Sequence, residues 1–350
     1  MAGSPRSTKS LVSKISFTTV FVALLVAVPL SLMAAVTFGT VNISFSDVYL
    51  HILSGPTAND ALSDVVWQIR LPRLILATFV GMALATCGVV MQAIVKNPLA
   101  DPYILGISSG GTLGATFATL LGFGAVFGSN AIGVMAFFGA LGSSFLVLFL
   151  SRLGGKTTAV KLLLSGLAVG ALCGAVSNFV IFLSNDANAT KQLVHWGMGS
   201  LAGAQWVTNL VIGVVILLGT LFFWTQSRRL NLMLLGDDTA ITLGTDLRRW
   251  RIGYIVVTSL MIGFSVFSAG MIGFVGLVIP HIVRMCFGTD HKKLLPISAL
   301  GGALLLIWAD VACRVVIAQS EIPIGILTSL IGAPLFVYLL ARSRYNFGEN

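Results

Sequence analysis

The sequence predicts an all-α membrane protein, with ten transmembrane helices and a charged loop between the sixth and the seventh. Of the 350 residues, 56% are hydrophobic and only 9% are charged, whereas soluble domains contain about 25% charged residues. The mean hydropathy is +0.96. Successive apolar segments have the length of roughly 20 residues that spans a bilayer.

The ten candidate spans follow one another with short connections, so one polytopic domain is expected over residues 15–341. They are residues 15–36, 71–95, 104–122, 130–150, 159–183, 206–225, 252–269, 272–287, 296–317 and 324–341. Residues 1–14 and 342–350 are expected to be cytoplasmic tails. The first span is too long for the core of a secretory signal, and further spans follow it.

The basic residues orient the chain. Ten spans place both termini on one side, and then only Arg70, Arg73, Lys191 and Arg314 fall on the opposite side. The positive-inside rule therefore makes the termini and the charged loop cytoplasmic. Because the basic residues gather at the ends of spans, the net charge of +9 indicates membrane orientation rather than nucleic-acid binding.

The longest break in the apolar pattern is Ser227–Arg251, with five arginines and three aspartates. Asp237 or Asp238 can cap a short helix that ends at Gly244, and the Thr-Asp pair that follows can cap a second. A basic loop that only holds orientation is the simpler alternative. A simple linker does not need two capped helices. We therefore interpret Ser227–Arg251, which we call the platform, as the binding surface for a soluble partner.

Two arginines stand on the unfavoured outer side, at the end of residues 39–69. They flank Pro72 in the motif Arg70-Leu71-Pro72-Arg73, and proline suits the first turn of the second span. The arginines could anchor lipid phosphates or form a docking site for an acidic partner. Both alternatives remain open from the residues alone.

Charge within the predicted spans is nearly absent. Asp310 and Arg314 lie four residues apart on one helix face, at pairing distance, and Glu321 could join Arg314. The middle of each span is apolar or small, without the charged coupling sites of a secondary transporter. The energy for transport is therefore expected from another polypeptide, and a self-contained ion-coupled transporter or channel is the alternative.

Catalytic and metal-binding motifs are missing from the sequence. It contains neither HExxH nor GxSxG, and its four cysteines lie singly in apolar runs. Gly154-Gly155-Lys156-Thr157 resembles the end of a phosphate-binding loop, but Leu150 replaces the required glycine. We expect no metal site and no enzymatic activity, and an intramembrane enzyme is the least favoured alternative.

Six motifs resemble the permease subunits of iron-siderophore, haem and cobalamin ABC importers, the FecCD-like type II importers. They are RLPR (70–73), QAIVKNPLADPYILG (92–106), WGMGSL (196–201), GFVGLVIPHIVR (273–284), LPISALGGALLLIWADVACR (295–314) and EIPIGILTSLIGAPLF (321–336). The resemblance covers residues from about 40 to 340, in the family's order and spacing.

The resemblance implies a non-catalytic permease with ten transmembrane helices per subunit, in a bacterial or archaeal cytoplasmic membrane. Two copies would form the path for haem, a ferric siderophore or cobalamin along a two-fold axis. Two cytoplasmic ATPase subunits would hold ATP and Mg²⁺, while this chain binds no cofactor. A substrate-binding protein would dock outside, and lipid would surround the dimer. Nothing in the apolar spans selects among the three cargoes.

The resemblance also implies three sets of site residues. The outer arginines that would pair with glutamates of the binding protein are Arg70, Arg73 and Arg314. The residues that would contact the ATPase lie within Ala240–Trp250 and are Ala240, Ile241, Thr242, Leu243, Gly244, Arg248 and Arg249. The cytoplasmic gate would include Asn97 and Leu99, together with Thr157 and Thr158, which match by placement rather than by motif.

Overall fold

A computed structural model describes residues 16–39, 43–56, 60–153, 158–184, 186–317 and 320–342, and in these ranges it contains helices and no strand. Each predicted span contains a helix. These are α1 (Phe17–Thr37), α4 (Leu71–Val95), α5 (Ile107–Leu121), α6 (Ala131–Arg152), α7 (Ala159–Leu183), α9 (Trp206–Thr225), α12 (Arg248–Ala269), α13 (Val275–Phe287), α14 (His291–Val315) and α15 (Ile324–Arg342).

Seven of these helices are long and apolar enough to cross a membrane. The exceptions are α5, with 15 residues, and the apolar helical runs Val275–Phe287 and Ile324–Tyr338. The all-helical membrane fold is thus confirmed, while the number of ten complete crossings stays a prediction. The predicted N-terminal tail, residues 343–350 of the predicted C-terminal tail and the gate residue Thr157 lie outside the described residues.

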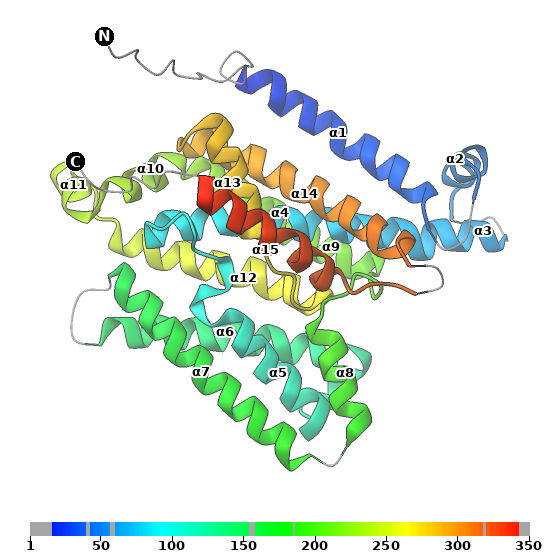
Figure 1. The fold of residues 1–350 in the computed structure, drawn as a ribbon, viewed down its shortest axis with the longest axis horizontal. Helices are drawn as coiled ribbons and strands as arrows, with labels where there is room; N and C mark the ends of the chain where they lie inside the picture. The colour runs from blue at the N-terminus through cyan, green and yellow to red at the C-terminus, as the bar shows by residue number, and fades with distance from the viewer. Residues whose placement is uncertain are drawn as a thin grey trace, which may run out of the picture.

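Short helices gather at the two ends of the bundle (Figure 1). At one end, which the basic residues predict to be cytoplasmic, lie the platform helices α10 (Ser227–Leu235) and α11 (Asp237–Thr242). At the opposite end, called the outer end after its predicted side, lie α2 (Phe45–Ser54), α3 (Ala61–Asp64) and a π-helical turn that leads into α4. Pro72 occupies the first turn of α4, as predicted. The outer helix α8 (Ala187–Gly197) precedes α9.

The central helix is α4, which is buried over most of its length and packs against α9, α12, α13 and α14. Small residues allow this because they let helix backbones approach closely. A Cβ atom on Gly81 would lie 2.2 Å from the carbonyl oxygen of Gly302 on α14. The two helices therefore touch backbone to backbone, and a side chain at either position would force them apart.

Helices α5 to α8 form a second group below the central one in Figure 1. Helix α5 packs on α6 through glycines: a Cβ on Gly114 would lie 2.0 Å from the carbonyl oxygen of Met135, and one on Gly110 2.4 Å from that of Gly139. On α7, by contrast, Gly174 has open space around it. Helix α12 joins the two groups by packing on both α4 and α6.

Candidate functional site

The outer end of the bundle holds a buried ionic cluster. Arg73 donates from Nε to Asp310 Oδ1 at 2.6 Å and from Nη1 to Glu321 Oε2 at 2.7 Å. Arg314 Nε lies 3.0 Å from Asp310 Oδ2, so the predicted pair at i and i+4 is confirmed. Glu321 joins this cluster as expected, but through its bond to Arg73, while Arg314 directs its Nη1 to the carbonyl oxygen of Phe38, at 2.6 Å.

Two of the three arginines also hold the end of α1. Arg70 Nη1 donates to the carbonyl oxygens of Val36, at 2.7 Å, and Thr37, at 3.0 Å, while Arg314 reaches Phe38. The last carbonyls of a helix lack partners within it and carry partial negative charge. The arginines thus complete the C-terminus of α1 and tie it to α4 and α14.

Burial distinguishes the members of this cluster. The side chains of Arg73 and Arg314 are 7% and 5% exposed and that of Asp310 is 0% exposed, whereas Glu321 is 41% exposed. All three arginines predicted for docking therefore lie together, beneath the surface rather than on it. Glu321 is the accessible carboxylate of the cluster.

The platform, at the opposite end of the bundle, differs in detail from the prediction. Helix α11 begins after Gly236, without a side-chain cap. Asp237 instead accepts a hydrogen bond at 2.6 Å from Arg251, which is 4% exposed and belongs to α12. Partial burial raises the pKa of Asp237, but the bond and charge of Arg251 outweigh this and lower it below its usual value. The carboxylate therefore stays charged at neutral pH.

The end of the platform is otherwise close to expectation. Gly244 follows α11 with φ +78°, a conformation that favours glycine. The second capped helix is the start of α12 itself, where Asp246 Oδ1 accepts from the Arg248 backbone N–H at 3.0 Å. The platform thus consists of α10, α11 and the first residues of α12, through which the chain enters the bundle.

Most of the residues predicted for ATPase contact form one exposed surface. Ile241 and Leu243 are 56% and 61% exposed, and Thr242, Gly244, Arg248 and Arg249 are exposed beside them. Ala240 is fully buried and faces the interior of the platform. Exposed aliphatic side chains next to arginines are chemically suited to a protein interface.

Two side-chain contacts that no sequence motif predicted fix α10 to the bundle. Arg229 stacks over the ring of Trp250 at 3.8 Å, a cation–π contact. Asn231 donates to Asp290 Oδ1 at 2.9 Å and accepts from the His291 backbone N–H at 2.9 Å. Asn231 and Asp290 are 59 residues apart, so no local spacing could indicate this bond.

The predicted gate turn after α4 is stiffened by its own side chains. Lys96 ends the helix in the left-handed conformation, with φ +55°. Asn97 Oδ1 accepts from the Leu99 N–H at 2.9 Å, and Asp101 Oδ1 accepts from the Tyr103 N–H at 2.8 Å. Burial raises the pKa of Asp101 from 3.8 to about 6, although the Tyr103 N–H opposes the shift.

A cavity of about 320 Å³ connects this turn with the platform. Lys96 and Thr158 line it on one side, and Asp237, Ile241 and Arg251 on the other. Thr158 also caps α7, since its Oγ1 accepts from the Lys161 N–H at 3.2 Å. The structure thus brings the predicted gate residue Thr158 to the platform, whereas Asn97 and Leu99 lie outside the lining.

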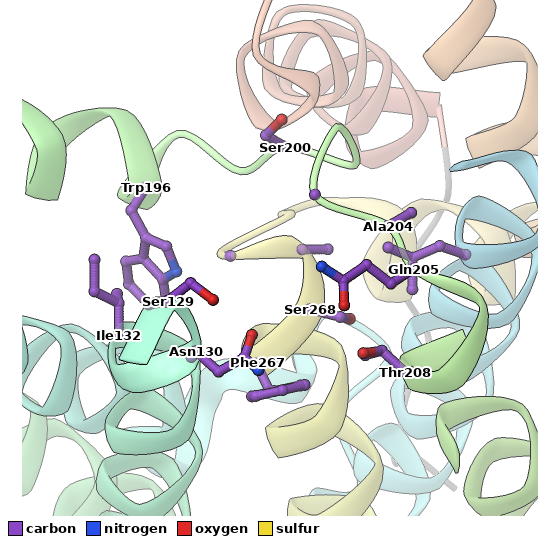
Figure 2. A pocket seen from close by; sticks show the side chains of 15 residues that line it. Ser129, Asn130, Ile132, Trp196, Ser200, Ala204, Gln205, Thr208, Phe267 and Ser268 are labelled. Carbon is purple, nitrogen blue, oxygen red and sulfur yellow. The ribbon is translucent and has the colours of Figure 1, made fainter. Parts of the chain in front are cut away.

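A second cavity, of about 260 Å³, opens at the outer end between the two helix groups (Figure 2). Asn130, Trp196, Gln205, Thr208 and Phe267 project into it from four different helices or their ends. The residues that line it are all uncharged and include polar, aromatic and aliphatic ones. No motif in the sequence predicted this opening.

Comparisons with known proteins cover nearly the whole chain. The model of the FecCD transport family matches residues 19–342. The hemin transport system permease protein HmuU of Yersinia pestis is 41% identical over 320 residues, covering 90% of this chain and 94% of the relative. The vitamin B12 import system permease protein BtuC of Salmonella paratyphi A is 44% identical over 279 residues, covering 79% and 84%.

A solved structure supports the same relationship. An inward-facing metal-chelate type ABC transporter superposes with a TM-score of 0.81 at 31% sequence identity. The match covers 93% of this chain and 100% of that one. The similarity therefore includes the platform, the gate turn and the outer cluster.

Proposed function

This chain belongs to the FecCD transport family, and from that membership we propose its function. We propose that it is the permease subunit of an ATP-driven importer for an iron complex, either haem or a ferric siderophore, or for cobalamin. Two copies would form the translocation path. The protein would span the inner membrane several times, with both termini in the cytoplasm.

The observation that carries this proposal is the exposed surface around Ile241 and Leu243. These side chains, on α11 and directly after it, are more than half exposed, while Asp237 and Arg251 fix that helix to α12. A firmly attached helix with an apolar tip can transmit a push from a soluble partner. We propose that this partner is an ATPase subunit and that residues 241–244, 248 and 249 contact it, with Ala240 supporting them from inside.

The inner cavity suggests how such a push would reach the path. Thr158 and Lys96 face the platform across it, and Lys96 leads directly into the turn of Asn97 and Leu99. Displacement of α11 would shift both walls of the cavity together. We propose that this displacement opens and closes the path at Asn97, Leu99 and the start of α7, where Thr157 and Thr158 precede the helix.

The outer cluster is the proposed docking site for a substrate-binding protein. It combines Arg70, Arg73 and Arg314 with Asp310 and Glu321, so its positive charge exceeds its negative charge by one. This excess favours an acidic partner. Because the guanidinium groups are buried, a direct ion pair with a partner requires Glu321 to move away from Arg73.

Reconstitution tests this function. The tagged chain is purified with the ATPase that accompanies it and placed in liposomes with the binding protein of the same system. We expect uptake of one of three probes, hemin, a ferric siderophore or cyanocobalamin, to require hydrolysable ATP. Uptake by this chain alone, driven by an ion gradient without hydrolysis, would instead establish the alternative of a self-contained transporter.

A further inference from the structure

We infer that Asn231 is a positioning residue that couples the platform to the outer end of the bundle through α14. This inference rests on the proposed function and adds a connection to it. Asn231 lies on α10 and holds the turn at the start of α14 with both ends of its amide. Its role follows from what α14 contacts along its length.

The contact at the inner end is specific in geometry. Asn231 Nδ2 donates to Asp290 Oδ1 at 2.9 Å, and Asn231 Oδ1 accepts from the His291 N–H at 2.9 Å. The ring Nδ1 of His291, a side chain that is almost fully buried, lies 2.6 Å from the same Oδ1. Asp290 also accepts from the Lys292 N–H at 3.1 Å, so it caps α14 while it holds Asn231.

The contacts further along α14 reach the outer cluster. Gly302 touches the backbone of Gly81, so α14 and α4 form a stiff pair. About two to three helical turns beyond Gly302, Asp310 and Arg314 enter the ionic cluster with Arg73 of α4. A helix held rigidly at both ends transfers displacement along its axis, since packed helices shift as units.

The consequence is mutual. If the platform moves α14 through Asn231, then an event at the outer cluster biases the platform by the same free energy. Docking outside would thereby change ATP hydrolysis inside without a direct contact between the two partners. The bond from α10 to α14 is thus proposed to carry the signal that matches hydrolysis to the arrival of cargo.

The test exchanges the two side chains. Asn231→Asp places two carboxylates against each other and removes the donor to Asp290. Asp290→Asn is the matched control, because an asparagine there can still accept from Asn231 and Lys292. The double variant Asn231→Asp with Asp290→Asn restores the bond between the two side chains with its direction reversed: residue 290 now donates, and the carboxylate at 231 accepts from it and from the His291 N–H.

The measured quantity is the ratio of ATP hydrolysis with the binding protein to hydrolysis without it, in the liposomes described above. We expect Asn231→Asp to reduce this stimulation by about tenfold, within the usual range of coupling between sites, with unstimulated hydrolysis and ATPase association retained. Asp290→Asn and the double variant should behave like the wild type. Thermal unfolding of each variant identifies any loss that reflects stability alone.

Three outcomes separate the explanations. Normal stimulation in Asn231→Asp would overturn the inference and leave the proposed importer intact. A double variant as impaired as Asn231→Asp would also overturn it, because the restored bonds would then not matter. A wild-type complex that shows no stimulation and no ATP-dependent uptake would refute the proposed function itself.

Discussion

The two ends of the bundle hold their charges in opposite ways. At the outer end, Arg73, Arg314 and Asp310 are almost completely buried and bonded to one another. At the platform end, Arg248 and Arg249 are exposed, as is Ile241. Buried charges are stable only with their partners, whereas exposed charges can be replaced or bound by another protein. The outer cluster therefore fastens the fold, and the platform presents a surface.

The largest expected effect comes from removing a buried arginine. Arg73→Met should lower the free energy of unfolding by about 3 kcal/mol or more, because it leaves Asp310 buried with one cation fewer. The same change at the exposed Arg249 should alter stability by less than about 0.5 kcal/mol. Thermal unfolding in detergent measures both. Similar losses at the two positions would refute the contrast between the ends.

Two carboxylates, one with arginine partners and one without, should affect stability differently as the pH changes. Asp310 has two arginine partners, whereas Asp101 accepts from the Tyr103 N–H and has its pKa raised to about 6 by burial. The folded protein therefore holds the proton of Asp101 more tightly than the unfolded chain does, so its contribution to stability is greatest below pH 3.8. That contribution should fall by at most about 3 kcal/mol as pH rises to 6, and then stay constant.

Asp101→Asn should remove this pH dependence, since asparagine can still accept from Tyr103. Above pH 6 the variant should be more stable than the wild type, whereas Asp310→Asn should be less stable there. Unfolding temperatures across pH 4 to 8 provide the measurement. A wild-type stability that rises through this interval in step with Asp101 ionisation would contradict the assignment.

At the platform, Ile241→Asp should weaken ATPase binding without unfolding the chain. Burying an isoleucine at an interface contributes about 1.5 to 3 kcal/mol, so the dissociation constant should rise by about tenfold to a hundredfold. Ile241→Leu, which preserves the apolar volume, should bind normally. Co-purification and titration of the ATPase measure the effect. Unchanged binding in the aspartate variant would place the interface elsewhere.

The smallest effect concerns Glu321, the exposed carboxylate of the outer cluster. Because it occupies Arg73, Glu321→Gln should free that arginine for an acidic partner and tighten docking by about fivefold or less. The gain should disappear at high salt, where exposed charges are screened. Binding of the substrate-binding protein at two ionic strengths tests this. Weaker docking of the variant would instead make Glu321 itself a contact residue.

Much of the fold could be predicted because apolar length and proline or glycine punctuation are local signals. They located a helix in every candidate span, the short helix before Gly244 and the Asp310–Arg314 pair at i and i+4. The same signals could not establish ten complete crossings. Length rules describe a segment in isolation, and α5, with 15 residues, is shorter than they require.

The site was harder to predict because its decisive contacts join distant residues. Asp237 looked like a helix cap but pairs with Arg251, since a buried guanidinium binds a carboxylate more strongly than free backbone amides do. Glu321 was expected to pair with Arg314, but it accepts a hydrogen bond from Arg73, while Arg314 donates to the carbonyl oxygen of Phe38. Nothing in the sequence indicated that the side chains of the three outer arginines are buried. Their motif predicts a charge near the membrane surface but not whether the side chain points into the protein or into solvent.

The attachment of α1 to the outer cluster has a consequence for biosynthesis. Phe38 and its partner Arg314 are separated by 276 residues, so nearly the whole protein must be synthesised before the hydrogen bond between them can form. Until then α1, which exposes much of its surface, lacks this contact with α14. A chain truncated before α14 should accordingly leave its first helix open to chaperones and membrane proteases.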